Sequence, residues 1–411
     1  MSREGDQNAS RAAEFAARRS YGRLVAFLAA RTGNVAAAED ALADAFAAAL
    51  ADWPASGVPR NPEAWLMAVA RRRLIDAARR RRNSDTAAEH VRLLAEELAD
   101  AAATDHPIPD DSLGLMFACA HPAIDPAIRA PLMLQTVLGL DAARIAAAFL
   151  TSPATMAQRL VRAKHKIRRA GIPLRVPDAS ELPARLDAVL TAIYAGFAEG
   201  WTDVTGRRDL ADEAIWLGRL VVALLPSEPE ALGLLALMLH AEARHAARRD
   251  AAGAYVPLAG QDTEAWDSAL IDEAETLLHR AGAMATIGRY QLEAAVQSVH
   301  AARRGTGRTD WAAIEHLYQA LGQITDSPVV AINRAIAIAE LRGAAAGLAH
   351  LDGLPPDNRV AQYQPYWAAR ADLLARLGAH GAASEAYDQA IGLEADPAVR
   401  AFLQQRRGCI W

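Results

Sequence analysis

Cysteines, membrane-spanning segments and secretion signals are scarce or missing in this 411-residue chain. Two cysteines cannot build a disulfide framework, which excludes a disulfide-rich secreted domain and favours reduced thiols. The opening residues, MSREGDQNASRAAEF, contain acids and no apolar run. No later stretch approaches the roughly 18 consecutive apolar residues of a membrane span. We therefore expect a cytoplasmic protein that does not associate with membranes.

Motifs typical of enzymes and metal sites are also missing. The chain has no GxxxxGK phosphate loop, and Gly305–Gly307 lacks the strand and the lysine that such a site needs. His240 and His245 are separated by five residues, which places their imidazoles about 140° apart on a helix and argues against a shared metal. Cys119 and His121 stand at a predicted helix junction and favour packing over catalysis. We predict no catalytic residue, no metal and no cofactor.

Charge is distributed unevenly along the chain, although the formal net charge is only −5. Residues 1–177 sum to +5, and residues 178–411 sum to −10. Eight arginines against two acids occupy residues 60–82, and seven basic residues with no acid occupy residues 151–177. Seven acids against one arginine lie between them, over residues 89–111. Two basic segments separated by an acidic one indicate contact with nucleic acid.

The hydrophobic pattern predicts an all-α fold. Apolar residues make up 52% of the chain and recur at helical spacing nearly everywhere, while no stretch alternates with period two. Residues 83–111 and 172–181 are expected to be linkers, the second because of Pro173 and Pro177. The predicted helical blocks are therefore residues 10–82, 112–171 and 182–411.

The last block contains a repeat. Residues 330–352 align with residues 366–388 at a period of 36, with small residues at close-packing positions and an aromatic residue near the end of the second helix. The residues that fit best are Trp367, Ala371, Ala383, Tyr387 and Ala390. Helix pairs of about 34 residues with this pattern resemble tetratricopeptide units, which we expect from about residue 310. A chance match within an all-α bundle is the alternative.

Residues 142–171 have the spacing of a helix-turn-helix. Ser152 is a predicted N-cap, Pro153 opens the second helix and Gly171 closes it. One side of this helix is apolar, and the other carries polar and basic residues. An ordinary solvated helix would include Glu or Asp to balance this charge, and this helix has none. Such side chains can contact base edges and phosphates in a major groove. The candidate DNA-binding residues are Thr155, Gln158, Arg159, Arg162, His165, Lys166 and Arg169.

Residues 61–82 form a second basic helix, with Asn61 as its cap and Pro62 at its start. An aromatic side chain beside a row of guanidinium groups suits single-stranded DNA, because bases stack while cations follow the phosphates. Packing of Trp65 inside the block is an equal alternative for that residue. The candidate residues are Arg60, Asn61, Trp65, Arg71, Arg72, Arg79 and Arg80.

An acidic amphipathic helix is predicted over residues 34–53. Glu39, Asp40 and Asp44 lie on its exposed side. An acidic surface does not suit DNA, so this helix is either solvated or contacts a basic protein partner. The residues alone leave both alternatives open.

These motifs together resemble a known family. AEDALADAF, a tryptophan, and PEAWLMAVARRRLIDAARRRR are similar to conserved region 2 of the sigma-70 class, and SPATMAQRLVRAKHKIR is similar to the recognition helix of its region 4. Regions 2 and 4 joined by a short linker without region 3 resemble the extracytoplasmic-function, or group IV, sigma factors. The third block is similar to the long C-terminal extension of one subgroup of these factors.

The resemblance implies a factor that binds core RNA polymerase at the β′ clamp and β flap, recognises promoter DNA and starts transcription. Glu39, Asp40, Asp44 and Phe46 fall on the helix that meets the clamp in such factors. The helix with Trp65 falls where the −10 element is opened, and Gln158, Arg159 and Arg162 fall where the −35 element is read. A helix-turn-helix regulator with a peptide-binding helical array is the rival interpretation.

Two positions and one block depart from a minimal factor of this class. Ala43 stands where many members have a clamp-contacting glutamine, and Arg144 replaces an acid common in the first helix of the helix-turn-helix. The acidic C-terminal block could dock on the basic segment in cis and inhibit it. Alternatively, it could bind a protein partner or brace the two sigma regions. We expect a regulatory platform that activity requires.

Overall fold

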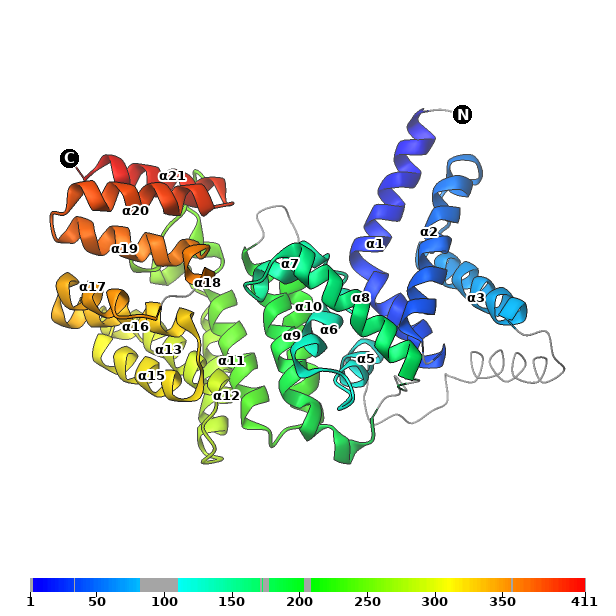
Figure 1. The fold of residues 1–411 in the computed structure, drawn as a ribbon, viewed down its shortest axis with the longest axis horizontal. Coiled ribbons are helices and arrows are strands. Elements are labelled where there is room, and N and C mark those ends of the chain that lie inside the picture. Colours follow the sequence, from blue (N-terminus) through cyan, green and yellow to red (C-terminus); the bar gives the residue numbers. More distant parts are fainter. Residues whose placement is uncertain are drawn as a thin grey trace. The chain divides into compact units, whose positions relative to one another are not determined.

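The computed structural model describes residues 3–32, 34–81, 110–170, 172, 177–202, 208–355 and 358–410. The all-α prediction is confirmed: these residues form helices and no strand, apart from an isolated bridge between Arg249 and Tyr255. The chain divides into two compact units, Met1–Thr202 with Gly206–Leu220, and Asp203–Thr205 with Val221–Trp411 (Figure 1). Within the described residues, no helix is long and apolar enough to cross a membrane.

The first unit is built from α-helices of unequal length, from the 30 residues of α1 to the 7 residues of α7. Its elements are α1 (Arg3–Thr32), α2 (Val35–Ser56), α3 (Pro62–Arg81), α5 (Asp111–Cys119), α6 (Pro126–Thr136), α7 (Ala142–Ala148), α8 (Pro153–Ala170), the 3-10 helix η1 (Ala179–Glu181) and α9 (Pro183–Thr202). Helix α10 (Asp209–Leu224) begins in this unit and ends in the second. Most of the linker expected over residues 83–111 lies outside the described residues.

Helix α2 shows how an alanine-rich sequence forms a close-packed bundle. The Asn34 side chain caps the helix by accepting the Ala37 backbone N–H at 3.0 Å, and Gly57, at φ 84°, ends it. Alanines on one stripe of the helix are buried with Leu42, and α2 packs on both α1 and α3. Because alanine side chains are short, the helix backbones approach closely, and the large side chain of Trp53 is buried near the end of the helix.

Helix α9 belongs to the same unit as the predicted helix-turn-helix. Arg185 is 2% exposed and donates hydrogen bonds to the Phe117 backbone carbonyl, at 3.1 Å, and to the Glu181 carboxylate, at 2.8 Å. Leu134 and Leu138, at the end of α6 and after it, face Gly196 of α9. The sequence placed α9 at the start of a separate block beginning at residue 182, whereas the structure builds it into the core around α5 and α6.

The second unit is a run of helices that continues to the C-terminus, drawn from green to red in Figure 1. Its longer elements are α11 (Pro229–Ala243), α12 (Ser268–Gly282), α13 (Arg289–Ala301), α15 (Trp311–Ile324), α16 (Pro328–Arg342), α17 (Ala344–Asp352), α19 (Gln364–Arg376), α20 (His380–Leu393) and α21 (Pro397–Gly408). Short turns of helix complete it: η2 (Ala246–Arg248), η3 (Leu258–Gly260), η4 (Thr263–Ala265), α14 (Arg303–Thr306) and α18 (Asn358–Ala361).

The 36-residue period corresponds to successive helix pairs, α16 with α17 and α19 with α20. Gly347 of α17 lies so close to Ala335 and Ala339 of α16 that a Cβ at this position would be 2.6 Å from the Ala339 Cβ. Arg376 pairs with Glu340 at 2.6 Å, which ties α19 to α16. Small residues therefore occupy equivalent places in neighbouring pairs, with Ala335 and Gly347 corresponding to the buried Ala371 and Ala383.

The second unit also contains one buried and one half-buried histidine. His240 of α11 is 1% exposed, with its Nε2 3.5 Å from the Glu275 carboxylate, and His300 of α13 packs edge-on against Trp311. Burial, and then the charge of the nearby Arg244 guanidinium, lower the pKa of each imidazole to about 4. Both side chains are therefore neutral in the folded protein at pH 7.

We predict that the second unit loses stability as the pH falls from about 6.5 towards 4. The unfolded chain takes up protons on these histidines in that window and the folded chain does not, so each depressed pKa contributes a slope approaching about 1.4 kcal/mol per pH unit. Urea unfolding followed by circular dichroism at pH 7.5, 5.5 and 4.5 measures this dependence. His240→Gln should flatten the slope, whereas His279→Gln, at an exposed position, should leave it unchanged. A steep slope that survives His240→Gln would contradict the prediction.

Candidate nucleic-acid and polymerase interface

Helix α8 is held at its N-terminus by a local cap. The Thr155 backbone N–H donates to the Ser152 hydroxyl at 3.2 Å, and that hydroxyl donates to the Thr155 hydroxyl at 2.8 Å. Leu150 turns the chain from α7 into α8 with a positive φ of 49°. Met156 and Leu160 are buried against the rest of the domain. This anchoring fixes which face of α8 points outward.

The outward face of α8 carries the basic and polar side chains that the sequence singled out. Six of the seven candidates are exposed: Gln158, Arg159, Arg162, His165, Lys166 and Arg169. Thr155 is half-buried and takes part in the helix cap. The structure thus brings these side chains onto one surface, with the hydrogen-bond donors that base edges and phosphates accept.

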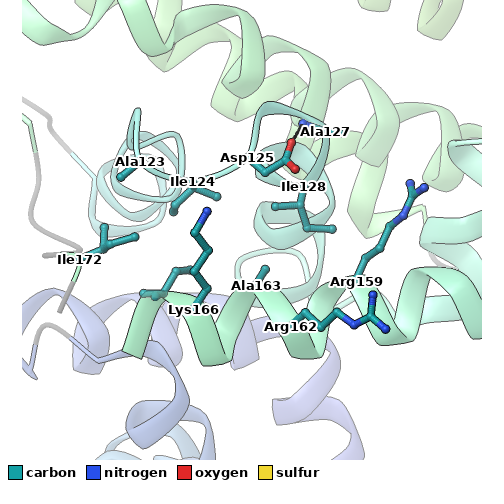
Figure 2. A pocket seen from close by; sticks show the side chains of 11 residues that line it. Ala123, Ile124, Asp125, Ala127, Ile128, Arg159, Arg162, Ala163, Lys166 and Ile172 are labelled. Carbon is teal, nitrogen blue, oxygen red and sulfur yellow. Dashed lines mark hydrogen bonds between the residues drawn. The ribbon is translucent and has the colours of Figure 1, made fainter. Parts of the chain in front are cut away.

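An open cavity of about 370 Å³ lies beside this surface, between α8 and the start of α6 (Figure 2). Arg159, Arg162 and Lys166 line its α8 side, and Ile124 and Ile128 belong to its apolar lining. Asp125 also lines the cavity, and its carboxylate caps α6 by accepting the Ala127 N–H at 3.0 Å. Three cations therefore border a recess whose one acid is engaged in a helix cap.

The candidate residues of the second basic helix, α3, differ in exposure: some reach solvent and others pack against neighbouring helices. Asn61 caps it by accepting the Ala64 backbone N–H at 3.0 Å, and Arg60 and Arg72 are exposed. Arg71 is half-buried, with its guanidinium 4.9 Å from the centre of the Phe27 ring. The side chains of Arg79 and Arg80 lie outside the described part of the chain.

Trp65 combines a packed edge with a partly accessible ring. It lies edge-on to the buried Trp53, with ring centroids 5.4 Å apart and planes inclined by 66°. The half-buried position matches both alternatives that the sequence left open for this residue, because one edge packs and the remainder reaches solvent.

The acidic face of α2 is split in a way that the sequence did not predict. Asp40 and Asp44 are exposed, as expected. Glu39 is half-buried, and both of its carboxylate oxygens accept hydrogen bonds from Lys164 Nζ of α8, at 2.9 and 2.7 Å. Phe46 is half-buried and stacks on Tyr21, with ring centroids 6.3 Å apart. Burial, and then the charges of Glu39 and Asp40, raise the pKa of Tyr21 to about 12.

Lys164 is the functional residue that sequence reasoning missed. It lies four residues after the buried Leu160, so it is on the side of α8 that turns towards the core. This spacing from Leu160 could have predicted that Lys164 does not share the outward face of α8. Arg144, noted for replacing an acid, also has a partner: its guanidinium lies 3.2 Å from the Glu199 carboxylate of α9. A basic residue in α7 is thus matched by an acidic one in the helix packed beside it.

Comparisons with known proteins place this geometry in a family. A model for sigma-70 region 2 matches residues 17–84, and a model described as a family of unknown function (DUF6596) matches residues 185–282. Uncharacterized protein R00370 of Rhizobium meliloti (strain 1021) is 40% identical over 383 residues, which cover 91% of this chain and 90% of that protein. The chain belongs to the same family as this rhizobial protein. No solved structure matches it.

The sigma-70 region 2 of this family member spans the later part of α1, together with α2 and α3. These helices carry the acidic face of α2 and the basic helix with Trp65. Sigma-70 region 2 implies interaction with core RNA polymerase and promoter DNA, and it supports a role in transcription initiation. The family of unknown function begins at Arg185 in α9 and ends at Gly282, the last residue of α12. Its match therefore starts inside the first unit.

We predict that Trp65→Ala lowers the free energy of unfolding by about 1–3 kcal/mol, because it removes the edge contact with Trp53 and part of the buried ring. Trp65→Phe retains an aromatic edge and should recover most of that loss. Urea unfolding followed by tryptophan fluorescence and circular dichroism measures both variants. Equal stability of Trp65→Ala and the parent chain would show that the ring contributes nothing to the core.

Proposed function

We propose that this chain is an extracytoplasmic-function sigma factor with a regulatory helical extension. It binds core RNA polymerase through α2, captures the −10 element with α3, reads the −35 element with α8 and acts in the cytoplasm. The observation that carries the proposal is the match of sigma-70 region 2 to residues 17–84, followed along the chain by the basic exposed face of α8.

The geometry of α8 supports the −35 assignment. A capped helix that follows a short helix and a tight turn, with six polar or basic side chains facing solvent, can insert into a major groove. Gln158 and Arg159 lie in its first half, the part of a recognition helix that contacts base edges, and Arg162 lies just beyond its midpoint. The cations nearer its C-terminus suit phosphate contacts, which provide affinity without sequence information.

The exposed acids of α2 support the clamp assignment, and α3 supports the −10 assignment. Asp40 and Asp44 remain accessible to a basic partner surface. Trp65 offers a partly open aromatic ring next to the exposed Arg72 and Asn61, the combination that single-stranded DNA requires. Ala43 is exposed between the two acids and offers no side-chain polar group for the contact that a glutamine makes in many such factors.

The C-terminal helix pairs support a tetratricopeptide-like regulatory platform. Their 36-residue period, small packing residues and the ion pair between Arg376 and Glu340 support a stacked array of the kind that binds a protein partner. Helix α9 packs into the core that holds α8, so the extension is physically continuous with the proposed −35 domain. We propose that activity requires this extension.

Run-off transcription tests the function directly. Core RNA polymerase alone should not start at a cognate promoter, and addition of the purified full-length chain should produce a defined transcript. A chain that binds DNA specifically but yields no transcript with core polymerase would favour the rival, a helix-turn-helix regulator with a peptide-binding array.

Arg162→Ala should cost about 1–3 kcal/mol of binding free energy at the cognate −35 element and should relax sequence preference there. Binding of the polymerase complex to promoter variants measures this change. Val161→Ala, at an exposed apolar position of the same helix, is the control and should have no effect. A uniform loss on cognate and random DNA would indicate that Arg162 contacts only phosphate.

Reversing both exposed acids, Asp40→Lys with Asp44→Lys, should weaken binding to core polymerase by roughly tenfold or more and leave the helical content unchanged, because neither side chain is buried. Pull-down or interferometry with immobilised core enzyme measures the affinity. Asp52→Lys reverses a charge at an exposed position near the other end of α2 and should bind normally. Unchanged affinity of the double variant would remove this face from the interface.

Truncation after Leu224 tests the extension. This position retains α9, whereas truncation in the 172–181 segment would strip α9 from the core of the first unit. Promoter-specific transcription by the truncated chain should fall well below that of the full chain, at equal helical content per residue. A truncated chain more active than the full one would make the extension an inhibitor.

A further inference from the structure

The first unit contains an ion pair between its two halves. Lys164 Nζ of α8 lies 2.7 and 2.9 Å from the two carboxylate oxygens of Glu39 in α2, although the residues are 125 positions apart in sequence. Their side chains are 21% and 18% exposed. A doubly hydrogen-bonded ion pair that is largely withdrawn from water holds its partners in a defined geometry.

Further contacts join the same two halves. Helix α1 packs along α5 and reaches the end of α6. Gly22 of α1 lies directly against the Val137 backbone, so that a Cβ at this position would clash with the Val137 carbonyl oxygen. Tyr21, the neighbouring residue, faces Gly139. The helices of region 2 therefore pack on the domain that contains α8 through several contacts, and the Glu39–Lys164 ion pair is one of these contacts.

The position of Lys164 distinguishes it from the other cations of α8. The whole chain has two lysines, Lys164 and Lys166, and both lie on this helix. Lys166 is exposed on the surface with Arg159 and Arg162, while Lys164 turns towards α2. One lysine thus belongs to the outward basic face, and the other holds an acid on the proposed polymerase-binding helix.

This arrangement cannot coexist with simultaneous reading of two promoter elements. Elements centred near −10 and −35 are separated by about 25 base pairs, or roughly 85 Å at 3.4 Å per pair. In the structure, α2 and α8 are in direct contact through Glu39 and Lys164, and α3 packs on α2.

We propose that the first unit is a closed form of the factor, in which Lys164 holds Glu39 and core RNA polymerase must displace that contact to bind α2. This inference rests on the proposed function, and it adds a regulatory contact at the polymerase-binding face. Binding and closure compete for the Glu39 carboxylate, because it cannot accept hydrogen bonds from Lys164 and from a basic polymerase surface in the same geometry. Breaking the closed contact increases the fraction of chains that are open and able to bind. The apparent affinity for core polymerase rises by the same factor as that fraction.

Carbodiimide cross-linking detects the closed form in the full-length chain. The reagent activates a carboxylate, and an amine in direct contact displaces the leaving urea to form an amide. The two lysines and the N-terminus supply the amines, so the products are few, and mass spectrometry of the digest should show a Glu39–Lys164 link in the free protein. Saturating core polymerase should abolish this link. Its absence from the free protein, or its persistence in the complex, would overturn the proposal.

Two variants open the contact by different means. Lys164→Ala removes the ion pair, and Gly22→Ala introduces a clash at the second point of contact. Each should increase affinity for core polymerase by about threefold or more over the parent chain. Val161→Ala, exposed on the same helix, should bind as the parent does. Circular dichroism of Gly22→Ala shows whether it folds, and Lys164→Ala alone carries the test if it does not.

The outcomes separate the two hypotheses. Equal core affinity of the parent chain and of a folded Lys164→Ala variant would overturn the closed-form proposal and leave the sigma-factor function standing. A Glu39–Lys164 link in the free chain, without core binding by any variant, would instead overturn the proposed function and, with it, the regulatory role of the contact.

Discussion

The contact between α2 and α8 is the constraint on which the arrangement of the first unit depends. Helix α2 carries an acidic face and α8 a basic one, and Lys164 of α8 donates hydrogen bonds to both carboxylate oxygens of Glu39 of α2. The same contact limits what the unit can bind while it persists, because Glu39 belongs to the face that we propose for core polymerase. The same ion pair therefore joins the two halves of the unit and, in our proposal, regulates binding to core polymerase.

The core around α5, α6 and α9 sets a second condition. Arg185 is buried and bonded to the Phe117 carbonyl, and Arg144 is matched by Glu199, so the domain that presents α8 includes a helix from the C-terminal extension. The match to the family of unknown function begins at this helix. Truncation of the chain before α9 would consequently uncover the apolar surface of α5 and α6 on which α9 packs.

Sequence periodicity was sufficient for the fold class and for the orientation of single helices. The apolar stripe and the acid-free polar face of α8 predicted which residues are exposed, because side-chain direction on one helix follows directly from 3.6-residue geometry. The Asn61 cap of α3 was likewise readable, since the helix start that it predicts depends on neighbours in sequence.

Contacts between distant segments could not be read in that way. Lys164 and Glu39 are 125 residues apart, and nothing in local spacing pairs them. The same reason hid the membership of α9: proline-rich composition suggested a boundary at 172–181, whereas tertiary packing of Arg185 and Gly196 decides where the unit ends. For Trp65, composition left stacking on DNA and packing as equals, and the half-buried geometry against Trp53 shows that one ring serves the core while keeping an open part.

The distance between α2 and α8 tests the account most directly, since it reports the closed form and its release by polymerase together. Spin labels at Asp52→Cys and Val161→Cys, both exposed, in a Cys409→Ser background that leaves only the buried Cys119, allow this distance to be measured by electron paramagnetic resonance. We predict a single short distance in the free full-length chain, and its replacement by a much longer one in the complex with core polymerase and promoter DNA. The same short distance in both states would contradict the account.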